Sequence, residues 1–183
     1  MKTHHKKSER VVSKVFQDVF DKYDLMNDLM SLGIHRLWKM NFINWLNPQE
    51  NTTLIDVASG TGDIAKLYLN KINYKGSVCC VDENKEMLNL NKKKIRKNAN
   101  AKWFCSSAEK LPFKNNCFDY YTISFGIRNI ENINNALKEA YRVLKPGGRF
   151  LCLEFSKVKN EILNKFYKTY SKSIPAIGKF VVG

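Results

Sequence analysis

The sequence lacks the patterns that are typical of membrane-spanning, secreted or metal-binding proteins. No apolar run approaches the roughly 20 residues of a membrane span, and the start has no signal-peptide core. The five cysteines form no C-x-x-C pair; they are Cys79, Cys80, Cys105, Cys117 and Cys152. Their odd number favours buried free thiols in a reducing cytoplasm over disulfides or zinc, so we expect no metal site. The 183 residues suffice for one domain with a real core.

Acidic residues are also scarce. The chain has 17 Asp and Glu against 31 Lys and Arg, which gives a formal net charge of +14. Basic residues crowd one predicted helix at 92–97 and recur from Lys157 onward. Such an excess attracts an anionic partner, either a nucleic acid or a membrane surface, but a solvated surface explains it equally well. Charge alone does not choose among these interpretations.

What the sequence does contain is a strand, a tight turn and a helix start at residues 54–65. Residues 53–57 are β-branched or apolar apart from Asp56, as in a strand that is covered on both faces. Residues 58–62 are all small, so the backbone of the turn can approach a ligand closely. Asp63 then lies at the positive end of a helix. This arrangement predicts a ligand crevice at the carboxyl edge of a doubly wound sheet.

Two cofactor classes could use this turn. A dinucleotide fingerprint, G-x-G-x-x-G, needs a glycine or alanine at position 63, where this chain has an aspartate. The alternative pattern, D-x-(G/A)-x-G-x-G, is matched by Asp56, Ala58, Gly60 and Gly62. It suits S-adenosyl-L-methionine, because this sulfonium cation brings no phosphate to neutralise. Either cofactor needs a carboxylate for its ribose about 20 residues later, and Asp82 ends the next apolar segment. We therefore predict a methyl-donor site.

The rest of the chain alternates strands and helices, which is typical of a parallel α/β sheet. Further strands are expected at 77–82, 101–105, 118–124 and 149–155, with helices at 85–97 and through 136–143. Lys-Pro-Gly-Gly at 145–148 is a strong signal for the end of the second helix. The loop at 106–113 and the turn at 125–129 each follow a strand, so both belong at the carboxyl edge.

Residues 1–50 are predicted to form a helical lid over the substrate. An apolar helix face at 12–20 follows a Ser8 cap, and the segment at 23–39 has more apolar residues than one packing stripe needs. Its flexible methionines suit an adaptable wall over an oily ligand. The cofactor-binding core is expected at 51–156, and 157–183 would begin a helical region that faces the substrate or a membrane.

Four stretches carry a resemblance to a known family. They are 22–28 with 33–39, then 56–65, then 123–129, and 141–149 with 153–157. With them the sequence resembles the ubiquinone/menaquinone biosynthesis C-methyltransferases, which are class I S-adenosylmethionine-dependent methyltransferases. The first stretch and Phe-Gly-Ile-Arg-Asn at 125–129 are specific to that family. The resemblance implies a Rossmann-like fold and C-methylation of the ring of a polyprenyl quinol. Relatives continue past Gly183 into two more strands, so we expect the chain to be C-terminally incomplete.

By position, the resemblance places the family's methyl-donor contacts on five residues: Thr61, Asp82, Ser107, Ala108 and Ser124. With the turn pattern, the predicted cofactor site is Asp56, Gly60, Thr61, Gly62, Asp82, Ser107, Ala108 and Ser124. Three positions depart from the family pattern. Ala58 replaces the first glycine, Ser107 stands where Asn or Asp is usual, and Glu83 replaces an apolar residue. The last two weaken the expected contacts around the adenine.

Methylation of a quinol ring carbon requires that a ring hydroxyl lose its proton. The ring carbon becomes a nucleophile once a ring hydroxyl is deprotonated, and a phenol has a pKa of about 10. A cation or a base is therefore needed near neutral pH. The candidates are Arg128 in the turn at the carboxyl edge, and Tyr23 and His35 from the lid. Each also has an ordinary structural explanation: an ion pair for Arg128, core packing for Tyr23 and a structural histidine for His35.

Two other functions stay open. One is a nucleic-acid methyltransferase, although the (N/D/S)-P-P-(Y/F) motif of enzymes that act on base amino groups is replaced by Ser-Phe-Gly-Ile at 124–127. The other is an inactive fragment or assembly subunit that keeps the fold. We expect a polyprenyl quinol substrate, a peripheral membrane surface at the inner membrane face and no nucleic acid. A homo-oligomer and a quinone-biosynthesis complex both stay open, as does the choice between benzoquinol and naphthoquinol.

Overall fold

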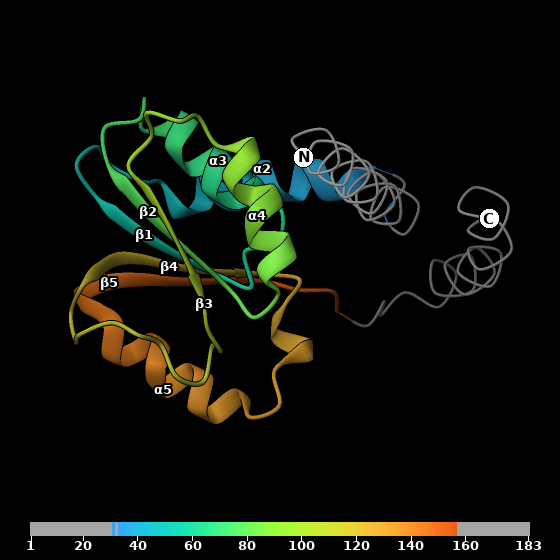
Figure 1. The fold of residues 1–183 in the computed structure, drawn as a ribbon, viewed down its shortest axis with the longest axis vertical. Coiled ribbons are helices and arrows are strands. Elements are labelled where there is room, and N and C mark those ends of the chain that lie inside the picture. The colour runs from blue at the N-terminus through green and yellow to red at the C-terminus, as the bar shows by residue number, and fades with distance from the viewer. Residues whose placement is uncertain (1–30, 32, 157–183) are drawn as a thin grey trace, which may run out of the picture. The chain divides into compact units, whose positions relative to one another are not determined.

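Ser31 and residues 33–156 are the part of the chain that the computed structural model describes (Figure 1). Residues Trp38–Phe155 form one unit, and a second unit comprises Met1–Leu37 with Ser156–Gly183. The predicted apolar face at 12–20 and most of the predicted lid lie outside the described residues, as does the region 157–183. The lid, core and C-terminal division therefore stays a prediction.

The unit Trp38–Phe155 is built on a five-stranded sheet in the order β3-β2-β1-β4-β5, and all its strand pairs are parallel. The strands are β1 (Thr53–Val57), β2 (Ser77–Asp82), β3 (Ala101–Cys105), β4 (Phe118–Ser124) and β5 (Leu144–Leu153). The helices are α2 (Ile34–Leu46), α3 (Asp63–Lys71), α4 (Lys85–Lys94) and α5 (Ile133–Val143), with a 3₁₀ turn, η1 (Ile127–Asn129). In Figure 1, α3 and α4 lie on one face of the sheet and α5 on the other. The prediction of a parallel, doubly wound α/β sheet is confirmed.

The strand order reverses direction at β1. The chain moves outward from β1 through β2 to β3, and then returns to place β4 on the other side of β1. In open α/β sheets, ligands bind outside the carboxyl ends of the strands at such a switch point. The turn after β1 is therefore where the fold itself expects a ligand.

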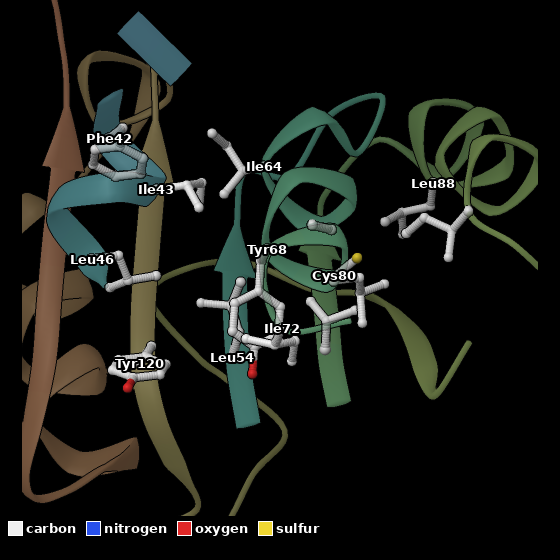
Figure 2. Packing of buried hydrophobic residues seen from close by; sticks show 14 residues of the cluster. Phe42, Ile43, Leu46, Leu54, Ile64, Tyr68, Ile72, Cys80, Leu88 and Tyr120 are labelled. Atoms are coloured by element: carbon white, nitrogen blue, oxygen red, sulfur yellow. The ribbon is translucent and has the colours of Figure 1, made fainter. Parts of the chain in front are cut away.

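β1 forms because its residues fit a strand that is covered from both sides. Leu54 packs in one apolar cluster with Tyr68 of α3, and Ile55 and Val57 pack in a second cluster with Tyr121 of β4. Figure 2 shows Tyr68 beside Leu54 and Ile72 in the first of these clusters. Each large apolar side chain buried in this way contributes about 1.5–3 kcal/mol. The two clusters fix β1 and thereby the origin of the turn that follows it.

Three predicted boundaries, in two elements, were wrong. α4 ends at Lys94 instead of 97, because Ile95 already has an extended backbone. β5 pairs with β4 from Leu144, where 149 was expected, and it ends at Leu153 instead of 155. The register jumps between the pairs Phe118↔Leu144 and Tyr120↔Arg149, so Lys-Pro-Gly-Gly forms an irregular stretch inside the strand. The continuous ladder does begin at Arg149, as the sequence suggested.

All five cysteines are free, as predicted. Cys80 is buried, and Cys79 and Cys117 are half-buried. The prediction of burial was wrong for Cys105 and Cys152, which are exposed because they lie on the outer strands β3 and β5. Among the described residues, no helix is long and apolar enough to cross a membrane. The same residues contain no group of three His, Cys, Asp or Glu side chains arranged to hold a metal ion.

Candidate active site

The turn between β1 and α3 has a tightly coiled backbone. Ala58, Gly60 and Gly62 have φ angles of 51°, 49° and 84°, which lie in the left-handed region. The Ser59 N–H donates to the carbonyl of Val81 at 3.0 Å, so the turn is attached to β2. A β-carbon at Gly60 would meet no atom within 4 Å, which leaves the backbone approachable there. These are the properties predicted for a turn that holds a ligand.

Asp82 lies beside this turn, at the end of β2. Its carboxylate accepts the Gly60 N–H at 2.8 Å and the Asn84 N–H at 2.9 Å. Each carboxylate oxygen can accept more than one hydrogen bond, so both retain capacity for a pair of hydroxyls. The structure thus brings the predicted ribose carboxylate into direct contact with the predicted cofactor turn.

Asp56 and Ser124 place two buried polar atoms at the carboxyl ends of neighbouring strands. Asp56 is 1% exposed, and its Oδ1 accepts the Thr122 hydroxyl at 2.8 Å. Burial raises the pKa of Asp56 to about 7, with nearby Asp82 acting in the same direction. Asp56 Oδ2 and Ser124 Oγ have no hydrogen-bond partner among the described residues. Buried polar atoms of this kind normally have a partner, so their position fits a polar or cationic ligand group.

The loop that follows β3 carries the two predicted adenine contacts, Ser107 and Ala108. It starts beside Asp82, the predicted ribose carboxylate, because the Ser106 N–H donates to the backbone oxygen of Asp82 at 3.2 Å. The Ser107 hydroxyl accepts the Glu109 N–H at 3.2 Å, and the Ser107 carbonyl accepts the Lys110 N–H at 3.3 Å. The predicted ribose and adenine positions are therefore adjacent at one edge of the sheet.

Comparison with known proteins decides the family. The sequence model of the ubiE/COQ5 methyltransferase family matches residues 2–183. The chain belongs to this family. A Rickettsia prowazekii protein named ubiquinone/menaquinone biosynthesis C-methyltransferase UbiE is 53% identical over 189 residues, covering 100% of this chain and 76% of that protein. A Rickettsia bellii protein of the same name is 54% identical over 190 residues, covering 100% of this chain and 75% of its own length.

Solved structures support the fold of this ubiE/COQ5 family member. A SAM-dependent methyltransferase from Aquifex aeolicus is similar with a TM-score of 0.61 at 23% identity, over 67% of this chain and 66% of that one. The YcgJ protein of Bacillus subtilis gives a TM-score of 0.58 at 24% identity, over 70% of this chain, which spans 55% of that protein. The predicted family and the predicted class I methyltransferase fold are both confirmed.

The aspartate at position 63 is explained by two lysines from other helices. Its carboxylate pairs with Lys39 of α2 at 2.7 Å and with Lys94 of α4, whose ammonium also lies 3.4 Å from the Thr61 hydroxyl. Burial alone would raise the pKa of Asp63, but the two lysines lower it to about 2. In this member of the ubiE/COQ5 family, an ion cluster ties α2, α3 and α4 to the cofactor turn. Sequence reasoning missed both lysines, because they are 24 and 31 residues from Asp63.

Asn91 of α4 is a second contributor that sequence reasoning missed. It is 0% exposed, and its amide group donates to the Ser59 hydroxyl at 3.3 Å. Its side-chain oxygen accepts the indole N–H of Trp103 at 3.0 Å. Asn91 thus links the cofactor turn to α4 and β3. The only signal in the sequence was an amide side chain on the otherwise apolar inner face of a helix.

Arg128 lies in η1, directly after β4, where the resemblance to the ubiE/COQ5 family placed it. Its guanidinium pairs with the Glu154 carboxylate and lies 5.4 Å from the ring centre of Phe155. Phe155 stacks on Phe125 at 4.8 Å, and Trp38 contacts both rings at 5.9 and 6.4 Å. The structural explanation of Arg128, an ion pair, is therefore present, together with an aromatic cluster at the carboxyl edge.

The other two catalytic candidates belong to the second unit. His35 is 3% exposed, and its backbone N–H donates to the Ser31 hydroxyl at 3.2 Å. Tyr23 lies outside the described residues. Catalytic roles for Arg128, Tyr23 and His35 stay predictions.

Proposed function

We propose that this chain transfers a methyl group from S-adenosyl-L-methionine to a ring carbon of a polyprenyl benzoquinol or demethylmenaquinol. The reaction is a step in ubiquinone and menaquinone biosynthesis. One observation carries the proposal. The turn, Asp56 and Asp82 meet at the carboxyl edge of a chain that is 53% identical, over its full length, to a protein named for this reaction.

The residues at this edge fit the methyl donor. The Asp82 carboxylate would hold the ribose hydroxyls, and the backbone of residues 58–62 would follow the donor closely. Ser107 and Ala108 would lie at the adenine. Asp56 and Ser124 would face the amino-acid and sulfonium part, where buried polar atoms remain to be satisfied. When bound, S-adenosyl-L-methionine supplies an activated methyl group on a positively charged sulfur.

The charges at the edge favour this donor over a dinucleotide. Asp56, Asp63 and Asp82 lie around the cofactor turn, and the charges of Asp63 and Asp82 both raise the pKa of Asp56. Asp63 is paired with two lysines, so Asp56 and Asp82 are the carboxyl groups that would disfavour a pyrophosphate and suit a ligand with a sulfonium and an ammonium group. Lys39 and Lys94 neutralise Asp63, so its charge would not repel the carboxylate of the donor's amino-acid part.

The quinol side of the reaction would use Arg128 and the aromatic cluster of Trp38, Phe125 and Phe155. The three rings offer a flat apolar wall for a quinol ring. Arg128 lies next to them and would stabilise the phenolate that forms when a ring hydroxyl loses its proton. His35 and Tyr23 are the proposed groups for accepting that proton. A dry pocket that aligns the ring carbon with the methyl group supplies the rest of the acceleration.

The polyprenyl tail implies work at a membrane surface. A substrate with such a tail partitions into lipid, and the net charge of +14 favours approach to an anionic bilayer. We place the protein in the cytoplasm, peripheral to the inner face of the membrane. Homo-oligomers and a quinone-biosynthesis complex are compatible with this arrangement.

Two measurements test the proposed function. Calorimetry should detect binding of S-adenosyl-L-methionine and S-adenosylhomocysteine to the chain, with NAD as the competitor from the rival cofactor class. Transfer of a radiolabelled methyl group to a short-tailed demethylquinol then tests the reaction. Preference for NAD, or transfer to RNA in place of the quinol, would contradict the proposal.

A further inference from the structure

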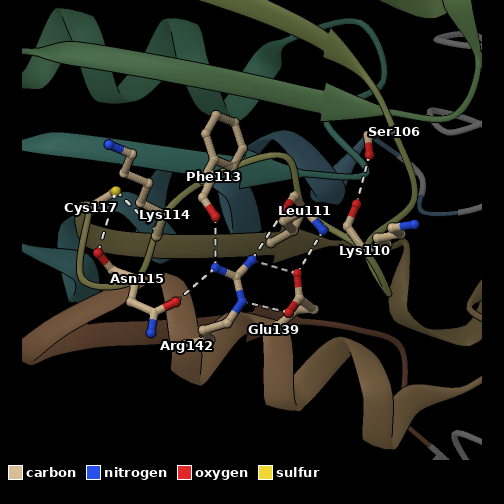
Figure 3. A network of polar contacts seen from close by, with 9 residues as sticks. All are labelled: Ser106, Lys110, Leu111, Phe113, Lys114, Asn115, Cys117, Glu139 and Arg142. Atoms are coloured by element: carbon tan, nitrogen blue, oxygen red, sulfur yellow. Dashed lines mark hydrogen bonds and ion pairs between the residues drawn. The ribbon is translucent and has the colours of Figure 1, made fainter.

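The loop that carries Ser107 and Ala108 is attached to α5 by the side chain of Arg142 (Figure 3). One terminal nitrogen of the guanidinium donates to the carbonyl of Phe113 at 2.7 Å and to the Asn115 side chain at 3.1 Å. The other terminal nitrogen donates to the carbonyl of Leu111 at 3.1 Å. A planar fork with several donors is needed to reach all three acceptors at once.

Glu139 completes this attachment from the preceding turn of α5. It accepts two hydrogen bonds from Arg142, one from Nε at 2.6 Å and one from a terminal nitrogen at 2.7 Å. The same carboxylate accepts the Leu111 N–H at 2.7 Å. The backbone of Leu111 is therefore held at both its N–H and its carbonyl. The hydrogen bond from Arg142 lowers the pKa of Glu139, so the pair stays charged at neutral pH.

A second attachment joins the same loop to the other end of α5. The Glu109 carboxylate accepts the backbone N–H of Asn132, the residue that caps α5, at 3.0 Å. At its start, the loop is bonded to Asp82 through the Ser106 N–H. Ser107 and Ala108 lie between these fixed points, in a turn that the Ser107 carbonyl closes. The predicted adenine contacts are therefore held between an attachment to α5 and an attachment to β2.

We propose that Arg142 and Glu139 are positioning residues for the adenosine part of the methyl donor. They hold the loop at 106–113 in the geometry in which Ser107 and Ala108 meet the base, and they touch neither cofactor nor substrate. The inference rests on the proposed function. An ion pair three residues apart on a helix contributes little to folding by itself. Its bonds to the loop backbone, in contrast, set ligand geometry, where a shift of about 1 Å has a large effect.

The test measures affinity and the fraction of folded protein in one experiment. S-adenosylhomocysteine is titrated calorimetrically into the unsubstituted chain, Arg142→Lys, Glu139→Gln and the control Lys138→Ala. Lys138 is an exposed cation on the same helix. Arg142→Lys keeps the charge but loses the fork, so we expect its dissociation constant to rise at least tenfold with the stoichiometry near one. Glu139→Gln keeps an acceptor for Leu111 and should give a smaller rise, and Lys138→Ala should bind as the unsubstituted chain does.

A second ligand locates the effect. 5′-Methylthioadenosine has the adenosine part but no amino-acid part, so its affinity should fall by the same factor as that of S-adenosylhomocysteine. A merely structural role would lower the stoichiometry or the melting temperature and leave both dissociation constants unchanged, which would overturn the inference. A loss confined to S-adenosylhomocysteine would overturn it as well. If the unsubstituted chain failed to bind S-adenosylhomocysteine, the proposed function would fail first and this inference with it.

Discussion

The side chain of Asn91 fills the space in which a β-carbon on residue 62 would lie. Gly62 also has a φ of 84°, a conformation that L side chains rarely adopt. Residue 62 therefore has to be glycine for two separate reasons, its backbone angle and its neighbour. Asn91 in turn bonds to Ser59, so the turn is supported from α4 while Gly60 stays approachable.

Gly62→Ala should lower the free energy of unfolding by about 2–5 kcal/mol. The left-handed backbone accounts for about 1–2 kcal/mol, and the collision with Asn91 adds about 1–3 kcal/mol. Gly147→Ala is the matched control, since Gly147 has a φ of 80° and no atom within 4 Å of its missing β-carbon. Urea unfolding measures both. Equal losses in the two variants would show that Asn91 gives way and that only the backbone angle matters.

The sequence predicted the strands well because their cause is local. β1, β2, β3 and β4 have the predicted bounds, since each is a short apolar run between turn residues. The contacts that hold the cofactor turn and the loop at 106–113 are not local. Asn91 is 32 residues from Ser59, and Arg142 is 31 from Leu111. A single sequence carries no sign of such pairs until the sheet order is known, which is why these contacts were found only in the structure.

Asp82→Ala should weaken the binding of S-adenosyl-L-methionine by about 1.5–3 kcal/mol, through the loss of charged hydrogen bonds to ribose. The structure adds a second effect, because Asp82 also accepts the Gly60 N–H of the turn. Asp82→Asn keeps one acceptor oxygen for that N–H and should therefore lose less. Calorimetry on the three proteins gives the comparison. Unchanged affinity in Asp82→Ala would refute the ribose assignment.

The buried carboxyl of Asp56 should make stability depend on pH. Its pKa is 3.8 without the fold and is raised to about 7 by burial. Between these values the folded chain keeps a proton that the unfolded chain has lost. Stability from this group is therefore fully present below the lower value and is lost as pH rises through about 7, by up to about 1.4 kcal/mol per pH unit. Asp56→Asn keeps an acceptor for Thr122 and should remove this slope in urea titrations without ligand.

Asp63→Asn is the control of opposite sign. The pKa of Asp63 is lowered from 3.8 to about 2, so its contribution is present above 3.8 and is lost as pH falls to about 2. The difference in the free energy of unfolding between the unsubstituted chain and Asp63→Asn should change only between pH 3.8 and about 2. A difference curve for Asp56→Asn that is flat from 3.8 to about 7 would contradict the assigned burial effect.

Arg128 has two possible roles, a structural one in its ion pair with Glu154 and a catalytic one at the phenolate, and kinetics can distinguish them. In a low-dielectric pocket, a guanidinium that stabilises the phenolate contributes roughly 3–4 kcal/mol, or about 10² to 10³ in rate. Arg128→Ala should slow single-turnover methylation of a short-tailed demethylquinol by that factor, with the affinity for S-adenosyl-L-methionine nearly intact. Arg128→Lys keeps the charge but lacks the planar fork, so its rate should lie between those of Arg128→Ala and the unsubstituted chain.

The ion pair itself supplies the comparison that decides the role of Arg128. Glu154→Gln breaks the pair but leaves the guanidinium in place beside Phe155, so a catalytic Arg128 should stay active in it. Lys145→Ala removes an ion pair of similar exposure, to Asp119, and corrects for general loss of stability. If Glu154→Gln and Arg128→Ala slow the reaction equally, Arg128 acts only through its ion pair. If Arg128→Ala keeps the parent rate, the proton must be handled without it, and Tyr23 and His35 become the residues to substitute next.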